Sequence, residues 1–378
     1  MIYLDNNATT QIDDPVVEVM QPYLTTQFAN PSSPYTFARP AALAIDRARS
    51  QIAAAISAPP SSIIFTSGGT ESNHLAILGA LPPHPSPGPR DTVLFTPFEH
   101  PSVARLKPIL QARGYQTIDL PLLPDGRLDL HQLQTLCTPR TALVCAMLAN
   151  NETGILYPLP EISAIAHRAG ALVHCDAVQT LGKIPLQAQP LGPDFISLCA
   201  HKLHGPKGTG ALYLRTPRNF TPPNAGGDQE FALRPGTENV PGIAGFGLAA
   251  ERAIAHGLPA MPPLALARDS FEQTLLQNLD GIHIVGHHQP RLPNTSLLAI
   301  DRVETEPLLI RLDQQGICAS SGSACSSGAH EPSPGLRALG FDQPGQAILR
   351  ISASRFNTPD HFTAAAHALI QAITRLRS

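Results

Sequence analysis

The chain has 378 residues, of which 43% are hydrophobic, and it exceeds the size at which one core usually stops growing, so we expect two domains or one large domain with a smaller satellite. Its 26 basic and 29 acidic residues give a formal net charge of -3, which provides no electrostatic reason to expect binding to nucleic acid or to an anionic membrane. No apolar run approaches the roughly 18 residues needed to cross a bilayer and the N-terminus has no signal-peptide pattern, so we expect a soluble, cytoplasmic protein.

Short apolar runs alternate with helical stretches through the first two thirds of the chain. These runs are residues 63–66, 92–96, 141–148, 171–175, 195–199 and 210–214. The alternation predicts an α/β fold with a mostly parallel sheet covered by helices on both faces. The pattern fades after about residue 251, and the proline-rich residues 258–263 are predicted to form a hinge. Beyond it, residues 294–300 and 346–352 predict strands of a smaller α+β domain, with a helix over 360–376.

A glycine-rich segment, residues 67–73 (SGGTESN), follows the first strand and precedes an apolar helical run. In open α/β sheets, ligands gather outside the carboxyl ends of the strands. Glycines such as Gly69 let the backbone approach an anion, and a helix N-terminus directs its N–H groups at it, so the segment is a candidate phosphate site. A Ser/Thr-rich turn before a helix is also what a simple N-cap requires.

Two charged residues come directly after later strands. Asp176 either caps the following helix or pairs with a cationic ring nitrogen, since a buried carboxylate needs such a partner. Lys202 lies between an apolar strand and a Gly-Pro turn, where it is either a surface lysine or a desolvated Schiff-base nucleophile. Together with the phosphate site, these residues match the needs of pyridoxal phosphate, namely a phosphate anchor, a partner for the pyridine nitrogen and an amine for the aldehyde. Lys207 is either a solvated turn residue or a helper for the phosphate.

Cys325 stands in residues 321–328 (SGSACSSG), among small residues that give a thiol no packing role. The segment predicts a mobile loop that carries a nucleophile, with an incidental surface cysteine as the alternative. The six cysteines form no Cys-x-x-Cys pair, so we expect neither disulfides nor a structural zinc. A metal site made of His174, Cys175, His201 and His204 fits no common zinc spacing.

In the order of these motifs the chain resembles the cysteine desulfurases of the class V aminotransferase family, over nearly its whole length. The matching stretches are residues 3–10, 30–33, 66–73, 99–100, 150–154, 176–179, 201–202, 205–208, 234–237, 350–352 and the Cys325 loop. The resemblance implies an aspartate aminotransferase-like fold with a seven-stranded, mostly parallel sheet. It also implies a large pyridoxal-phosphate domain over 13–257 and a small domain made of 1–12 and 258–378, with a long loop around Cys325.

The resemblance further implies a role for each matching residue toward pyridoxal 5'-phosphate. Lys202 would form the Schiff base, Asp176 would pair with the pyridine nitrogen and Gln179 would hydrogen-bond the ring's phenolic oxygen. His100 would stack on the ring and shuttle protons. The residues expected near the phosphate are Gly69, Thr70, Cys199, His201 and, from the other subunit of a homodimer, Thr237.

The implied reaction is the conversion of L-cysteine to L-alanine with a persulfide left on Cys325. Asn151 and Arg350 would bind the substrate carboxylate, for which a guanidinium is well shaped. The sulfur would pass to acceptor proteins, either scaffolds of iron-sulfur cluster assembly or proteins of a thiolation pathway. The alternatives are a related lyase acting on selenocysteine or cystine, and a silent binding scaffold, against which the intact Lys202 and Asp176 argue.

Three positions depart from the family's usual pattern. Cys199 stands where a phosphate-binding serine is usual, and a thiol is a weaker hydrogen-bond partner, so we expect reduced cofactor affinity. Tyr35 stands where histidine is frequent and Ser354 where glycine is expected.

Overall fold

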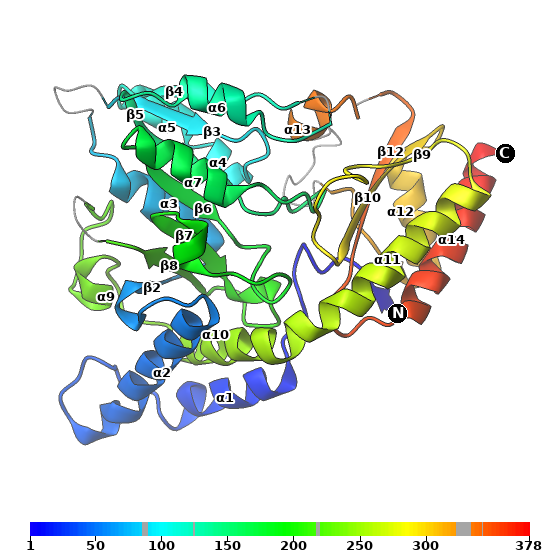
Figure 1. Ribbon diagram of the computed structural model, residues 1–378. Helices are drawn as coiled ribbons and strands as arrows, with labels where there is room; N and C mark the ends of the chain where they lie inside the picture. Colours follow the sequence, from blue (N-terminus) through cyan, green and yellow to red (C-terminus); the bar gives the residue numbers. More distant parts are fainter. Residues whose placement is uncertain (85–89, 124, 217–219, 323–333, 342) are drawn as a thin grey trace.

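The computed structural model describes residues 1–84, 90–123, 125–216, 220–322, 334–341 and 343–378. Its centre is a seven-stranded sheet of order β2-β8-β7-β6-β5-β3-β4 (Figure 1). The strands are β2 (Ile63–Thr66), β8 (Gly210–Leu214), β7 (Phe195–Cys199), β6 (Leu172–Asp176), β5 (Thr141–Cys145), β3 (Thr92–Phe95) and β4 (Gln116–Asp119). Only β8 runs antiparallel to its neighbours in this sheet. The predicted α/β fold is therefore confirmed.

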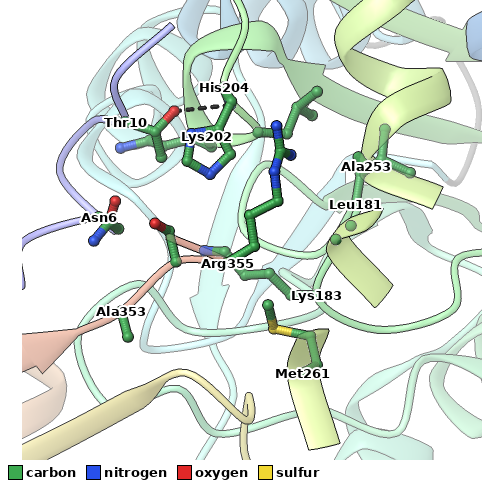
Figure 2. Close-up of a pocket in the computed structure, with 14 residues that line it drawn as sticks. Asn6, Thr10, Leu181, Lys183, Lys202, His204, Ala253, Met261, Ala353 and Arg355 are labelled. Atoms are coloured by element: carbon green, nitrogen blue, oxygen red, sulfur yellow. Dashed lines mark hydrogen bonds between the residues drawn. The ribbon is translucent and has the colours of Figure 1, made fainter. Parts of the chain in front are cut away.

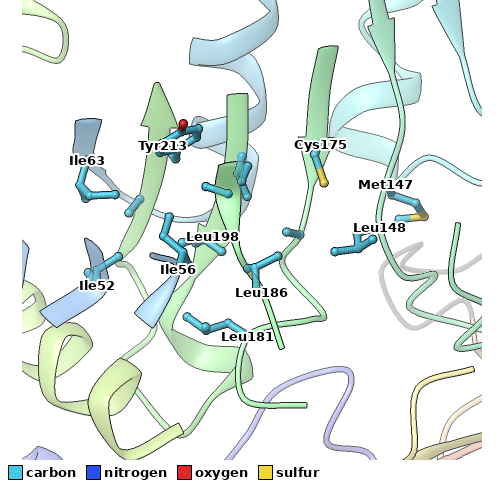
Figure 3. Close-up of a cluster of buried hydrophobic side chains, with 14 of the residues drawn as sticks. Ile52, Ile56, Ile63, Met147, Leu148, Cys175, Leu181, Leu186, Leu198 and Tyr213 are labelled. Atoms are coloured by element: carbon cyan, nitrogen blue, oxygen red, sulfur yellow. The ribbon is translucent and has the colours of Figure 1, made fainter. Parts of the chain in front are cut away.

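Helices cover both faces of this sheet. One apolar cluster joins it to α3 (Gly69–Ala80), α4 (Pro101–Ala104) and α5 (Lys107–Ala112). A larger cluster joins the other face to α1 (Asp14–Thr25), α2 (Arg39–Ala55), α6 (Leu130–Leu136), α7 (Leu159–Arg168), α8 (Ala188–Leu191) and α10 (Val240–Arg252). Figure 3 shows Ile52 and Ile56 of this cluster beside Leu198 of β7 and Tyr213 of β8. Strands that are buried on both faces need apolar residues throughout, which is why they are recognisable as continuous runs in the sequence.

The C-terminal part builds a second, antiparallel sheet of order β12-β10-β9. It consists of β9 (Ile282–Ile284), β10 (Thr295–Asp301) and β12 (Gln346–Ser352), packed on α11 (Leu258–Asn278), α12 (Thr305–Gln314) and α14 (Pro359–Arg377). The N-terminal strand β1 (Ile2–Tyr3) pairs with β11 (Ile317–Cys318), so the two ends of the chain lie in the same part of the molecule (Figure 1). The described part of the chain also contains two short helices, α9 (Gln229–Ala232) and α13 (Pro334–Ala338). Within the described ranges, no helix is long and apolar enough to cross a membrane.

The hinge predicted at residues 258–263 is wrong, because this segment is the start of helix α11. Helix α10 continues into α11 through a π-helical turn, Ala253–Gly257. Pro259 lies in the first turn of α11, where a missing N–H costs little, while Pro262 and Pro263 follow within the helix. π-Helical turns and prolines are common causes of a bent helix. The prolines therefore mark an irregular stretch of helix, not a break in it.

The segment after β1 joins the two sheets. The backbone N–H of Asn6 donates to the carbonyl of Ser352 at the end of β12, and that of Thr10 donates to the carbonyl of His201 after β7, each at 3.0 Å. Between them, the Asn7 side chain donates to Thr295 Oγ1 at 2.9 Å. This crossing brings the end of β12 next to the carboxyl ends of the large sheet.

Candidate active site

A cavity of about 240 Å³ opens at the carboxyl ends of the central strands. The predicted site residues that line it are Gly69, Thr70, His100, Asn151, Asp176, Gln179, Cys199, His201, Lys202 and Arg350. Thr237 is exposed on the loop before α10 and is not among the lining residues. Cys325 lies outside the described residues. The structure therefore brings together residues that are up to 281 positions apart, from Gly69 to Arg350.

Lys202 enters the cavity from the short 3₁₀ turn that ends β7. Its Nζ donates to the backbone oxygens of Asn7 at 2.6 Å and Ala8 at 2.7 Å. The turn is tight, because a Cβ on Gly205 would lie 2.9 Å from the backbone oxygen of Ala200. Lys202 is thus held by backbone oxygens on the wall of a cavity, so the surface-lysine alternative does not apply.

Asp176 ends β6, and only 5% of its surface is exposed. Its Oδ2 accepts a hydrogen bond from Asn73 Nδ2 at 2.8 Å, and its Oδ1 accepts one from the backbone N–H of Val178 at 3.0 Å. Turns follow it, and the next helix begins only at Ala188, so Asp176 does not cap a helix. Among the described side chains, no cation lies within ion-pair distance of this carboxylate. A buried carboxylate in this state suits a protonated ring nitrogen as its partner, as pyridoxal phosphate provides.

His100 is fixed by a short chain of polar side chains. It is the N-cap of α4, where its Nδ1 accepts from the backbone N–H of Ser102 at 3.1 Å. Asn73 Nδ2 donates to Ser102 Oγ at 2.8 Å as well as to Asp176. With Nδ1 occupied as an acceptor, the neutral ring carries its proton on Nε2. His100 and Asp176 are thus oriented by the same asparagine.

The residue before His100, Glu99, is a buried carboxyl group. Its Oε1 accepts from Thr96 Oγ1 at 2.6 Å and from the backbone N–H of Met147 at 2.7 Å. Burial raises its pKa to about 7, and the nearby charge of Asp176 contributes to the same shift. Below about pH 7 Glu99 therefore holds a proton.

The backbone at the start of α3 forms the wall of the cavity at the place where a phosphate could bind. A Cβ on Gly69 would lie 2.7 Å from Cγ2 of Val178, so the close approach of the two segments requires glycine. Thr70 in the first turn of the helix lines both the main cavity and an adjoining space of about 340 Å³. Helix N–H groups at this position can bind a phosphate.

His201 also lines the part of the cavity where a phosphate could bind. Its Nδ1 lies 3.1 Å from Thr9 Oγ1. Burial lowers its pKa to about 4, and the positive charges of Lys202 and Lys207 add to the effect. The ring is therefore neutral at neutral pH and can offer one N–H to an anion. Lys207 lies on the lining of the adjoining space.

Arg350 of β12 is almost fully buried and lines the cavity together with Asn151. Its Nη2 donates to Asp5 Oδ1 at 2.7 Å, and its Nη1 donates to the backbone oxygens of Asn151 at 3.0 Å and Gly322 at 3.3 Å. Its Nε is buried without a hydrogen-bond partner among the described residues. A guanidinium on the wall of a cavity is well suited to a carboxylate.

Several residues of this site were not identified from the sequence. Asn7, Asn73 and Glu99 stand in stretches that match the family, but no role was assigned to them; Ser102 and Lys183 stand outside those stretches. Their positions depend on contacts between distant segments, such as the bond from Asn73 to Asp176. Within the described ranges, no group of three or more His, Cys, Asp or Glu side chains could hold a metal ion.

Cys199 lies on the wall shared by the main cavity and the adjoining space. Its Sγ has a distant contact, 3.9 Å to the backbone oxygen of Thr209. We expect Cys199→Ser to lower the dissociation constant for pyridoxal phosphate about 2- to 10-fold, since a hydroxyl forms a better hydrogen bond to a phosphate than a thiol. Absorbance titration of the cofactor-free protein measures this change. Cys199→Ala is the matched control; equal affinities for the serine, alanine and parental proteins would contradict the expectation.

Comparison with known proteins places this geometry in a family. The family Aminotransferase class-V matches residues 2–363. The chain is 42% identical over 379 aligned positions to a cysteine desulfurase of Nostoc sp. (strain PCC 7120) and 41% identical to the cysteine desulfurase NifS of Azotobacter vinelandii; each alignment covers 100% of this chain and 94% of the relative. Among solved structures, a NifS-like protein superposes with a TM-score of 0.90 at 33% identity, covering 99% of both chains. A NifS-like protein from Rickettsia africae gives 0.86 at 32% identity, covering 98% of this chain and 99% of that one.

Proposed function

Because the chain belongs to the class V aminotransferase family and is a cysteine desulfurase, we propose that it binds pyridoxal 5'-phosphate in the 240 Å³ cavity and transfers the sulfur of L-cysteine to Cys325. The observation that carries this proposal is the buried, cation-free carboxylate of Asp176 in the same cavity as the amine of Lys202. The alternative lyase for selenocysteine or cystine is not favoured, because the curated relatives are named cysteine desulfurases.

In this proposal each part of the cofactor is bound by different residues of the cavity. Lys202 would hold it covalently, Asp176 would pair with its ring nitrogen and Gln179 would donate to its ring oxygen. The N-terminus of α3, with Gly69 and Thr70, and the neutral ring of His201 would hold its phosphate through backbone and side-chain N–H groups. When bound, the cofactor supplies an electron sink that stabilises negative charge at the α-carbon of the substrate.

The chain's own residues then bind the substrate and move protons. Arg350, which lines the cavity, binds the substrate carboxylate, with Asn151 beside it. Lys202 would hold and move a proton at Nζ near the substrate α-carbon, and His100 would hold one at Nε2. The backbone oxygens of Asn7 and Ala8 keep the Lys202 amine directed into the cavity.

The sulfur transfer leaves all atoms accounted for. The Cys325 thiolate attacks the substrate sulfur, a sulfur–sulfur bond forms, and the bond between that sulfur and the substrate carbon breaks. The carbon takes a proton and leaves as L-alanine, while Cys325 keeps the extra sulfur as a persulfide. An ordinary thiol has a pKa of ~8.5, so a nearby cation or base has to assist its ionisation.

We also propose that two copies of the chain form a homodimer. Leu24 and Phe28 are 63% and 69% exposed, and the Phe28 ring packs edge-on against Phe37, also exposed, with centroids 5.4 Å apart. Exposed apolar side chains in such a group are typical of an interaction surface. Thr237 is exposed and absent from the lining of its own cavity, which suits a residue that serves the partner's phosphate site.

The remaining proposals concern organisation and delivery. The division into a domain over 13–257 and one made of 1–12 and 258–378 is supported by the separate apolar clusters under the two sheets. Sulfur-acceptor proteins, including scaffolds of iron-sulfur cluster assembly, are the proposed recipients of the persulfide, and the cytoplasm is the proposed location.

The test is a short pulse of L-cysteine given to the protein loaded with pyridoxal phosphate, followed by mass spectrometry of its peptides. We expect the mass of one added sulfur atom on the peptide that contains Cys325, together with one alanine formed per adduct. A protein that forms no alanine would refute the activity proposed here. An adduct on Cys318 in place of Cys325 would refute the assignment of the acceptor thiol.

A further inference from the structure

Lys183 is a buried lysine that the proposed reaction does not use. It lies in the turns that follow β6, and only 8% of its surface is exposed. Its Nζ donates to Gln179 Oε1 at 2.6 Å and to Asn7 Oδ1 at 2.9 Å. No carboxylate of the described chain lies within ion-pair distance of it. A buried amine bound only by amide oxygens is costly, so its presence calls for an explanation.

The contact with Lys183 determines which way the Gln179 amide faces. An ammonium group at Nζ has N–H donors and no acceptor, so the end of the amide that meets it is the oxygen. The nitrogen end then faces the backbone oxygen of Asn7, at 2.9 Å, on the wall of the cavity. That nitrogen has two N–H groups and one acceptor among the described residues, so one N–H remains for a group inside the cavity.

Asn7 connects the two lysines. Its backbone oxygen accepts from both Lys202 and Gln179, while its side-chain oxygen accepts from Lys183. Asn294 Nδ2 donates to the same side-chain oxygen at 3.3 Å. Lys183 is therefore part of the framework that fixes the atoms around the Lys202 amine, without lining the cavity itself.

We propose that Lys183 is a positioning residue: it holds the Gln179 amide with its N–H toward the cavity, so that this N–H donates to the negatively charged ring oxygen of the cofactor. The inference rests on the proposed use of pyridoxal phosphate and on the assignment of Gln179 to its ring oxygen. Without Lys183 the amide loses the contact at its oxygen and is held only by the bond from its nitrogen to Asn7, so its N–H is directed less firmly at that charge.

The electrostatic surroundings agree with this role. Burial lowers the pKa of Lys183 well below its ordinary value, and the positive charges of Lys202 and Arg350 act in the same direction. His204 and Arg355 line a small cavity of about 30 Å³ together with Lys183 and Lys202 (Figure 2). The other cationic groups on this lining are Lys202 and Arg355, and the described partners of the Lys183 Nζ are the amide oxygens of Gln179 and Asn7.

The visible absorption of the loaded enzyme tests the proposal, because it depends on whether the nitrogen joining Lys202 to the cofactor holds a proton. A donor to the ring oxygen stabilises its negative charge and so favours loss of that proton. We expect Lys183→Met to raise the midpoint of the absorbance change with pH by about one unit, the scale of one hydrogen bond to a charged group. The titration is done without cysteine, so a negative result leaves the desulfurase reaction untouched.

A double-mutant cycle separates positioning from a general effect on folding. Gln179→Leu is expected to shift the midpoint by a similar amount, and adding Lys183→Met to it is expected to give no further shift. Lys107→Met, which removes a lysine remote from the cavity, is the matched control with a parental midpoint. A parental midpoint in a folded, cofactor-loaded Lys183→Met protein would overturn the proposal, as would full additivity in the cycle.

Lys183→Arg provides a second, conservative variant. It keeps N–H donors, and the small cavity in Figure 2 offers room for the larger head group. A midpoint close to the parental one is expected. If Lys183→Met does not fold, Lys183→Arg still tests the proposal. A midpoint of its absorbance change displaced as far as in Gln179→Leu would contradict the positioning role of Lys183. A protein that takes up no pyridoxal phosphate would refute both this inference and the proposed function.

Discussion

Replacing Lys202 with alanine is expected to slow the formation of alanine from L-cysteine by at least about 10³-fold, because one side chain supplies both the covalent attachment and a general acid-base group. Its amine is held at the cavity wall by two backbone oxygens, those of Asn7 and Ala8. Lys183 cannot replace it, since its Nζ is committed to Gln179 and Asn7 outside the cavity lining. Initial rates of alanine formation measure the effect.

Cofactor retention provides an independent measurement on the same variant. We expect gel filtration to remove pyridoxal phosphate from the Lys202→Ala protein and to leave it on the parent. Lys107→Ala serves as the matched control, because Lys107 of α5 is ion-paired with Asp119 of β4 and does not line the cavity; this variant is expected to leave both rate and retention unchanged. A Lys202→Ala protein with a rate within tenfold of the parent would show that another amine does the work.

The sequence predicted those features that depend on neighbours along the chain. The runs that became β2, β6, β7 and β8 were visible because strands buried on both faces are apolar throughout. Asp176 and Lys202 could then be assigned to the site, because each follows a strand and such positions converge at one edge of a parallel sheet. These two residues could be assigned from the order of strands along the chain alone, without knowledge of side-chain contacts.

The features that the sequence did not predict depend on pairs of distant residues. Asn7 reaches Thr295, 288 positions away, and Asn73 reaches Asp176, 103 positions away. Nothing in the local pattern around these asparagines indicates such partners. The hinge predicted at 258–263 failed for a related reason, since proline preferences are local while the continuous helix is stabilised by packing against the second sheet.

Cys325→Ala is expected to lower the rate of alanine formation by at least about 100-fold when no other thiol is present, because the reaction loses its nucleophile toward the substrate sulfur. The cofactor is expected to remain bound with its parental absorption, since the change removes none of the groups proposed to hold it. An added small thiol is expected to restore part of the rate by taking the sulfur in place of Cys325. Alanine and sulfur products are measured with and without that thiol.

Cys318→Ala is the matched control for this prediction. Cys318 is half-buried in β11, where its backbone pairs with Tyr3, so its loss is expected to leave alanine formation unchanged. The pair of variants separates the two types of reaction that the sequence left open. A cysteine desulfurase needs a protein thiol to receive sulfur, whereas a lyase that releases sulfur directly does not. Parental rates in both variants would therefore contradict the persulfide mechanism, and loss of activity only in Cys325→Ala would support it.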